Sequence, residues 1–256
     1  MGGSMGVGNT SRNAVVLGAS AEGGSGWAIA ERLAEEGYKV AVAARRREGL
    51  EALATRIGGI AIVADAAQPP SMAAMIRQAK EQLGEIDVAV NAAAIAPTGL
   101  IKDASDDDIE RALNVNYVGS VHFIRHAAGA MRDGGLILLI SSSSANQPLL
   151  PMFPYACAKA AADCLVRYAA LEFGPRGIRV NSILPGPIKT GMAAHIYAEP
   201  GAEERRAREI PLGRVALPKD IADAVMAFVH APYLTGHNLP VSGGMHLTRP
   251  ARRDDT

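Results

Sequence analysis

The sequence has few cysteines, few aromatic residues and no excess of charge of either sign. Its 256 residues include two cysteines, 4% aromatic side chains, and 26 basic residues against 26 acidic ones. Two cysteines cannot build a disulfide framework, so we expect Cys157 and Cys164 to be buried thiols of a reduced, cytoplasmic protein. Balanced charge argues against a nucleic-acid binder, which needs a basic surface, and scarce aromatics argue against a platform for stacking bases.

Long apolar runs are also missing, so no segment is predicted to span a membrane. Residues 1–11 lack the basic and apolar stretches of a signal peptide, and we expect flexible tails over 1–11 and 248–256. A hydrophobic share of 48% excludes a disordered chain. The remaining length, 12–247, suits one large α/β domain with an ample core.

Apolar segments of strand length alternate with longer helical patterns along the whole chain. Because the strand segments are nearly wholly apolar, they indicate a parallel sheet that is buried on both faces, as in a doubly wound α/β fold. The charged region 186–217 breaks this alternation. We expect it to form an excursion, with a substrate lid over about 188–212, above the carboxyl edge of the sheet. Strands are predicted over 13–18, 39–43, 60–63, 87–91, 136–140, 179–184 and 238–241, and helices over 27–36, 46–57, 70–83, 106–132, 155–173 and 219–230.

A glycine-rich segment, 18–26, lies between the first predicted strand and the first predicted helix. Glycines let the backbone approach a pyrophosphate, and the amino end of a helix favours its negative charge. At the end of the second strand, where NAD-binding proteins place an acid, residues 43–47 instead read Ala-Ala-Arg-Arg-Arg. Arginines suit a ribose 2′-phosphate, so we predict that NADP(H) is preferred, with NAD(H) remaining possible.

The candidate catalytic pair is Tyr155 and Lys159, which share one face of a predicted helix because they are four residues apart. A nearby ammonium favours the phenolate form of a tyrosine, which could then exchange a proton with a carbonyl or alcohol oxygen. Such a pair is common on ordinary helices, so the spacing alone decides little. Ser142 lies thirteen residues upstream, just after an apolar strand, where a doubly wound fold keeps its ligands.

Taken together, these motifs resemble the short-chain dehydrogenase/reductase family over about residues 12–247. The resemblance implies a single-domain Rossmann fold of about seven strands in the order 3-2-1-4-5-6-7. The matching segments are Gly18…Gly24-x-Gly26, Asp65, Asn91-Ala-Ala-Ala94, Asn116, Ser142, Tyr155-x-x-x-Lys159, Pro185-Gly-Pro-Ile-Lys-Thr190 and the closing stretch 234–244.

The resemblance also implies a role for each matching residue. Tyr155 would be the acid/base, Lys159 would lower its pKa and hold the nicotinamide ribose, and Ser142 would hold the substrate oxygen. Asn116 would anchor a proton relay. Homotetramers or homodimers are expected. The implied cofactor contacts are Gly18, Ser20, Gly24, Ser25, Gly26, Arg45, Arg46, Asp65, Ala66, Asn91, Ala92, Tyr155, Lys159, Pro185, Gly186, Ile188 and Thr190.

Two other functions remain open. Five residues separate Gly18 from Gly24 where the family usually has three, which resembles the enoyl-thioester reductase branch. That branch places six residues between Tyr and Lys, and Met152 occupies the corresponding position here. The other alternative is a non-catalytic, cofactor-binding regulatory protein. We favour an NADP(H)-dependent enzyme that interconverts ketones and secondary alcohols, with no metal, and with substrate candidates Ser144, Leu149, Met152, Met192 and His195.

Overall fold

The computed structural model describes residues 12–191 and 197–248, so residues 1–11 and 249–256, where we predicted tails, lie outside it. Seven parallel strands form one sheet in the order β3-β2-β1-β4-β5-β6-β7, which confirms the predicted Rossmann-type architecture. The strands are β1 (Arg12–Leu17), β2 (Tyr38–Ala44), β3 (Ile60–Val63), β4 (Ile86–Asn91), β5 (Met131–Ile140), β6 (Arg179–Pro185) and β7 (Asn238–Val241).

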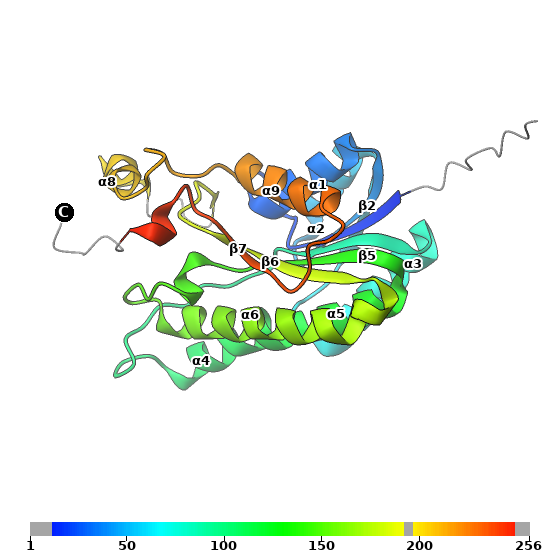
Figure 1. The fold of residues 1–256 in the computed structure, drawn as a ribbon, viewed down its shortest axis with the longest axis horizontal. Coiled ribbons are helices and arrows are strands. Elements are labelled where there is room, and N and C mark those ends of the chain that lie inside the picture. The colour runs from blue at the N-terminus through cyan, green and yellow to red at the C-terminus, as the bar shows by residue number, and fades with distance from the viewer. Residues whose placement is uncertain (1–11, 192–196, 249–256) are drawn as a thin grey trace, which may run out of the picture.

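Helices cover both faces of this sheet (Figure 1). One face carries α1 (Ser25–Glu35), α2 (Arg47–Ile57) and α9 (Pro218–His230). The other carries α3 (Pro69–Leu83), α4 (Asp106–Leu113), α5 (Gly119–Ala130) and α6 (Phe153–Phe173). Shorter elements are the π-helical turn η1 (Asn114–Val118), the 3-10 turns η2 (Ser143–Ala145), η3 (Gly174–Arg176) and η5 (Met245–Leu247), and the helix α8 (Ala202–Arg208). None of the described helices is long and apolar enough to cross a membrane.

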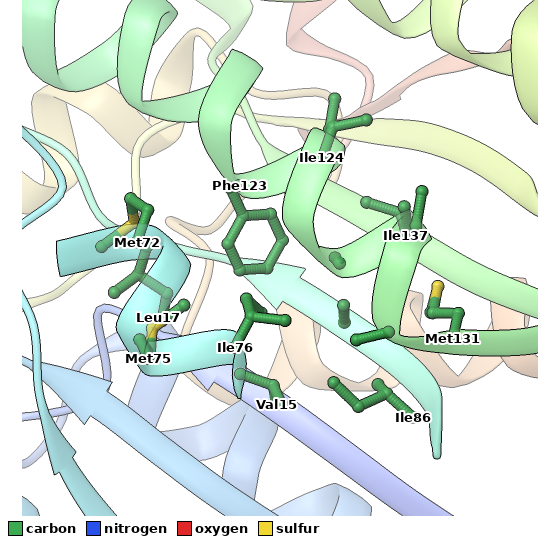
Figure 2. Packing of buried hydrophobic residues seen from close by; sticks show 14 of the residues in the cluster. Val15, Leu17, Met72, Met75, Ile76, Ile86, Phe123, Ile124, Met131 and Ile137 are labelled. Atoms are coloured by element: carbon green, nitrogen blue, oxygen red, sulfur yellow. The ribbon is translucent and has the colours of Figure 1, made fainter. Parts of the chain in front are cut away.

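Successive side chains of each strand point to opposite faces of the sheet, so two separate hydrophobic cores form. Val15 and Leu17 pack into the cluster under α3, α5 and α6, whereas Ala14 and Val16 pack into the cluster under α1, α2 and α9. Figure 2 shows the first cluster, in which Phe123 lies among methionines and aliphatic side chains of α3 and the strands. Because both faces of each central strand are buried, the apolar runs of the sequence carry no polar alternation.

The helix predicted over 106–132 is wrong in two respects. It is interrupted by the π-helical turn η1, and its end is already strand, because β5 begins at Met131 beside Ile86. The start of β5 cannot be recognised in the sequence because it contains polar residues and glycines instead of an apolar run. Arg132 forms an ion pair with Asp87, with its Nε 2.8 Å from Oδ1, and Gly134 adopts a left-handed φ of 82°. Tertiary pairing thus overrides a helical pattern here.

The predicted burial of the two cysteines is also wrong for Cys157, which is exposed, and holds only partly for Cys164. Helix α6 buries Ala158, Ala162 and Val166 against the sheet. Cys157 lies outside that buried stripe, so the small apolar character of a thiol did not decide its position.

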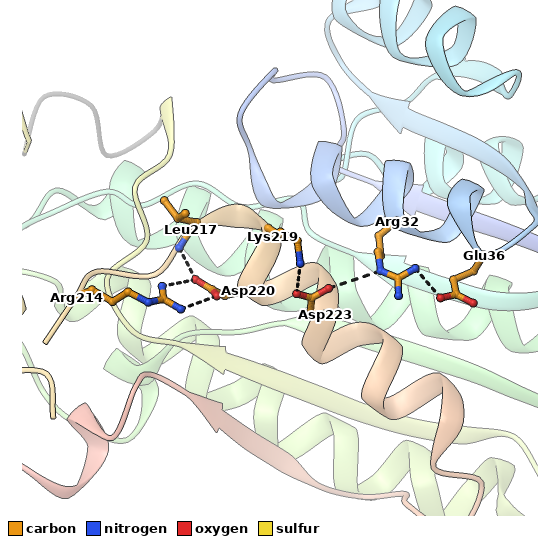
Figure 3. Close-up of polar contacts among 7 residues, drawn as sticks. All are labelled: Arg32, Glu36, Arg214, Leu217, Lys219, Asp220 and Asp223. Atoms are coloured by element: carbon orange, nitrogen blue, oxygen red, sulfur yellow. Dashed lines mark hydrogen bonds and ion pairs between the residues drawn. The ribbon is translucent and has the colours of Figure 1, made fainter. Parts of the chain in front are cut away.

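Charged side chains at the amino end of α9 connect this helix to its neighbours (Figure 3). Asp220 accepts two hydrogen bonds from Arg214, at 2.7 and 2.8 Å, and a third from the backbone N–H of Leu217 at 2.7 Å. One turn later, Asp223 lies 3.5 Å from Arg32 of α1. These contacts attach the end of the segment 186–217 to the helix that follows the glycine-rich loop.

Candidate active site

The glycine-rich loop joins β1 to α1 by a very close approach of backbone to backbone. Gly18 has a φ of 91°, and a Cβ there would lie 2.4 Å from the backbone nitrogen of Ala93. A Cβ on Gly26 would lie 2.4 Å from the carbonyl oxygen of Gly18. Only glycine fits either position. The N-terminus of α1, at Ser25 with Gly24 as its N-cap, therefore opens directly beside the end of β1.

The two additional loop residues form a small turn that leaves this crossing intact. The backbone N–H of Gly24 donates to Ala21 O at 2.9 Å, which closes the turn. Gly23, in the middle, has a φ of 70°, and a Cβ there would meet nothing within 4 Å. The insertion thus points away from the crossing of Gly18 and Gly26.

The end of β2 places the three arginines at the amino end of α2, all exposed. Arg47 has a carboxylate partner in Glu51 at 3.4 Å, and Arg46 donates from Nε to Ser20 Oγ at 3.3 Å. Cations at this end of a helix oppose its dipole, so a bound anion would offset their cost. Beside them lies a hollow of about 310 Å³, lined by Ser20, Glu22, Trp27, Arg46, Glu48, Gly49 and Ala52.

Two predicted contacts on the cofactor side hold the loops that follow β3 and β4. Asp65 Oδ1 accepts from the backbone N–H of Ala67 at 3.0 Å. Asn91 Oδ1 accepts from the N–H of Ala93 at 3.0 Å, and its Nδ2 donates to Ser120 Oγ at 3.3 Å. These side chains fix loop shape through the backbone.

Four more of the predicted cofactor residues, Pro185, Gly186, Ile188 and Thr190, line the start of the predicted lid. Ile188 pairs with Ala216 in an isolated β-bridge, so both ends of the segment 188–216 are held together. A Cβ on Gly186 would lie 3.0 Å from the side chain of Ser242. Within the segment, the helix α8 carries acidic residues in its first turn and arginines in its last.

Asn116 is buried in the π-helical turn η1 and exchanges two hydrogen bonds with the backbone of Ile95. Its Nδ2 donates to Ile95 O at 2.9 Å, and its Oδ1 accepts from the Ile95 N–H at 3.3 Å. Single π-helical turns are rare and occur preferentially at functional sites. The sequence predicted Asn116 as a site residue but gave no signal for the unusual turn that aims it.

Ser142, Tyr155 and Lys159 converge at the carboxyl end of β5. Ser142 Oγ lies 2.8 Å from Ser144 Oγ and also hydrogen-bonds the tyrosine hydroxyl. Lys159 Nζ donates to the carbonyl of Ile140 at 2.7 Å and lies 5.7 Å from the centre of the Tyr155 ring. Because Tyr155 and Lys159 stand one turn apart on α6, this helix aims both at the end of the strand that precedes Ser142.

Burial dominates the electrostatics of this trio. It raises the pKa of Tyr155, while the hydrogen bond with Ser142 lowers it and the charge of Asp163 raises it further. Lys159, which we expected to lower this pKa, is not among the groups that shift it in this arrangement. Burial also lowers the pKa of Lys159 to about 8, against an opposing effect of Asp163. Burial thus shifts both pKa values in the direction that favours the neutral form.

Asp163 is the buried charged group that we did not single out from the sequence. It lies on α6 four residues after Lys159 and is 4% exposed, as is Lys159. An aspartate at this spacing on an otherwise apolar helix face was the available signal. Its carboxylate reaches across to β6, where Ser182 Oγ lies 3.0 Å from Oδ1.

Three of the predicted substrate contacts, Ser144, Leu149 and Met152, fall on the segment that follows Ser142. The N–H of Gly99 donates to Pro151 O at 2.6 Å, so the loop after β4 lies alongside Met152. Large apolar side chains are exposed here: Ile101 at 81%, Leu149 at 47% and Leu150 at 71%. Gln147 Nε2 donates to Thr248 O at 2.9 Å and brings the C-terminal segment near. Met192 and His195 lie outside the described residues.

Comparison with known proteins identifies this arrangement. A family profile described as "Enoyl-(Acyl carrier protein) reductase" matches residues 18–246. A short-chain dehydrogenase/reductase from Serratia marcescens superimposes with a TM-score of 0.84 at 33% identity, covering 92% of this chain and 98% of that one. The chain belongs to the short-chain dehydrogenase/reductase family.

Two further relatives indicate the type of chemistry. Carbonyl reductase family member 4 of Xenopus laevis is 33% identical over 227 residues, which cover 88% of this chain and 94% of that protein. An actinorhodin polyketide ketoreductase, solved with NADPH, superimposes with a TM-score of 0.86 at 27% identity over 92% of this chain and 97% of that one. This chain is accordingly an oxidoreductase of the carbonyl/alcohol type.

Proposed function

We propose that this protein is an NADP(H)-dependent reductase that interconverts a ketone and a secondary alcohol, with Tyr155 as the general acid/base. The observation that carries the proposal is the convergence of Ser142, Tyr155 and Lys159 at the end of β5. The named relatives that act on carbonyl groups support the same reaction type.

In this mechanism each side chain acts on one oxygen atom of the substrate. Ser142 donates a hydrogen bond to the carbonyl oxygen and so stabilises the charge that develops there. Tyr155 donates its proton to that oxygen during reduction and recovers it from the alcohol during oxidation. The Lys159 ammonium lowers the cost of the phenolate that is left behind. The nicotinamide, when bound, supplies or accepts the hydride.

The residues of the cofactor edge suit an NADP(H) molecule. The open N-terminus of α1 beside Gly18 and Gly26 suits a pyrophosphate. Arg45 and Arg46 suit a 2′-phosphate, because among the described residues neither has a carboxylate within ion-pair distance. We therefore propose that NADP(H) is preferred, as predicted.

The substrate that we propose is an apolar ketone or secondary alcohol of middle size, such as a 3-oxoacyl thioester, a cyclic ketone or a steroid-like molecule. The exposed Ile101, Leu149 and Leu150, on the two segments that meet at Gly99 and Met152, support an apolar substrate. We further propose a homodimeric or homotetrameric enzyme of the reduced cytoplasm, for which the two free thiols and the exposed Tyr168 and Leu171 of α6 are suited.

An enoyl-thioester reductase is the second candidate, favoured by the lengthened loop and by the description of the matching family profile. Met152, which cannot donate a proton, stands where that branch has its tyrosine. A panel of ketones, alcohols and enoyl thioesters with both cofactors separates the two reactions. Conversion of an enoyl thioester without any ketone reduction would establish the second.

The variant Tyr155→Phe tests the proposed mechanism. Loss of the transferable proton should reduce turnover about 10²- to 10⁴-fold. NADPH affinity, measured by fluorescence titration, should stay within about twofold because the ring is kept. Tyr168→Phe is the matched control, since Tyr168 lies on the same helix and is 69% exposed. Full turnover by Tyr155→Phe would refute the mechanism.

A further inference from the structure

The buried face of α6 holds a second charged group that the proposed mechanism leaves unused. Lys159 and Asp163 are one helical turn apart, and each is only 4% exposed. Isolated buried charges are costly, and proteins normally pair them. Among the described residues, the hydrogen-bond partner of Lys159 Nζ is the carbonyl of Ile140, which leaves two of its three donors for other groups.

The Asp163 carboxylate is held by groups from two strands. Ser182 Oγ on β6 lies 3.0 Å from Asp163 Oδ1 and 2.8 Å from Asn238 Oδ1 on β7. Its single hydrogen can serve only one of them, and the carboxylate is the stronger acceptor. Asn238 Nδ2 donates to the backbone oxygen of Asp163 at 3.1 Å. These contacts fix the carboxylate with respect to the sheet.

The hydroxyl of Ser141, the neighbour of Ser142, is a further hydrogen-bond partner of the Asp163 carboxylate. The carboxylate is thus held by the hydroxyls of Ser141 and Ser182, while Lys159 lies one helical turn away in the same buried layer and forms no direct ion pair with it among the described residues. Arg167, the other cation near Asp163, donates instead to its backbone oxygen at 3.3 Å.

We infer that Asp163 is a positioning residue for the reaction: its fixed, buried carboxylate holds Lys159 in the charged form that Tyr155 requires. This inference rests on the proposed function, because it assigns Asp163 a role through Lys159. The electrostatics agree, since Asp163 opposes the lowering of the Lys159 pKa by burial. Burial raises the pKa of Asp163, and the hydrogen bonds with Ser141 and Ser182, followed by the charges of Lys159 and Arg167, lower it.

The test compares two variants of the same network. Asp163→Asn removes the charge but keeps an oxygen for Ser182, whereas Ser182→Ala removes the hydroxyl but keeps the charge. The pKa of Lys159 is about 8, so ketone reduction should decline above this pH. In Asp163→Asn the decline should begin at lower pH, and the ratio of kcat/KM at pH 6.5 to that at pH 8.5 should rise at least about threefold. In Ser182→Ala the charge is kept and one hydrogen bond to it is lost, so this ratio should rise less than in Asp163→Asn. An unchanged ratio in Asp163→Asn overturns the inference.

A second measurement needs neither activity nor a folded Asp163→Asn variant. Lys159→Met leaves Asp163 buried without its cation, so a proton on Asp163 should then stabilise the fold. The urea midpoint of Lys159→Met should approach that of the unchanged protein as the pH is lowered from 8 to 5. A gap between the midpoints that does not vary with pH overturns the inference. If no ketone or alcohol is converted, the proposed function fails, while this urea series still tests the pairing.

Discussion

The cofactor edge and the catalytic edge of the sheet differ in the kinds of groups that form them. At the cofactor edge, backbone atoms approach to distances that only Gly18 and Gly26 allow, and the charged side chains, Arg45 and Arg46, are exposed. At the catalytic edge, by contrast, Lys159 and Asp163 are charged groups withdrawn from water. Both edges lie at the carboxyl ends of parallel strands of one sheet.

This contrast follows from what each edge has to do. A phosphate brings its own charge, so backbone N–H groups and exposed cations suffice to hold it. A phenol that transfers a proton must have its pKa moved, and only groups shielded from water can do this strongly. We therefore expect substitutions at the catalytic edge to change turnover, and substitutions at the cofactor edge to change cofactor affinity.

The largest effect expected from this contrast, after that of Tyr155→Phe, belongs to Ser142→Ala. Removal of a donor to the developing oxyanion should lower kcat about 10²- to 10³-fold, with NADPH affinity nearly unchanged. Steady-state kinetics and a fluorescence titration measure both quantities. Ser143→Ala, one residue along, is the control and should retain most of its turnover. Equal losses in the two serine variants would contradict a specific role for Ser142.

At the cofactor edge we expect a smaller effect that is confined to one cofactor. Arg45→Ala combined with Arg46→Ala should raise the KM for NADPH about 10- to 100-fold, because charge-assisted hydrogen bonds to the 2′-phosphate are lost. The KM for NADH and the value of kcat should change little. Arg77→Ala, an exposed arginine of α3, serves as the control. A tenfold preference of the unchanged enzyme for NADH would refute the predicted cofactor.

The smallest effect is expected away from both edges, at the start of α9. Asp220→Asn weakens the contacts with Arg214 and Leu217, and the melting temperature at pH 7 should fall by at most about 3 °C. Arg214 holds the pKa of Asp220 below its usual value. The stabilisation is therefore present above the unfolded-state pKa and should disappear as the pH falls through the folded-state value. Calorimetry at pH 7 and in acid checks this.

Asp223→Asn is the control for this prediction, because Asp223 binds Lys219 and Arg32 but caps no helix (Figure 3). It should lower the melting temperature less than Asp220→Asn does. The opposite order would show that the cap at Leu217 contributes nothing.

Much of the fold could be predicted because buried parallel strands are almost purely apolar. Six of the seven strands were placed within two residues at each end, and the exception, β5, begins five residues earlier than expected. Its first half carries Arg132 and Asp133, whose charges are accommodated by partners distant in sequence. No local pattern reports such partners.

The residues of the candidate site also fall into those that the sequence pattern marks and those that depend on partners distant in sequence. Ser142, Tyr155 and Lys159 could be named because, together with the other motifs of the chain, they resemble the short-chain dehydrogenase/reductase family. The π-helical turn at Asn116 could not, because it inserts an extra residue into a helix without a local marker. Asp163 was overlooked because its importance depends on burial beside Lys159 and on Ser182 and Asn238 of two other strands.

The sequence by itself determined the order of strands and helices, the glycines of the loop after β1, the cations after β2 and the three residues of the candidate catalytic site. These are properties of local pattern and of residue chemistry, which each short segment carries alone. The tertiary structure decided where β5 begins, how Asn116 is aimed, and which carboxylate accompanies Lys159. Each of these depends on the energy of a buried polar group, and that energy is set by neighbours that only folding brings together.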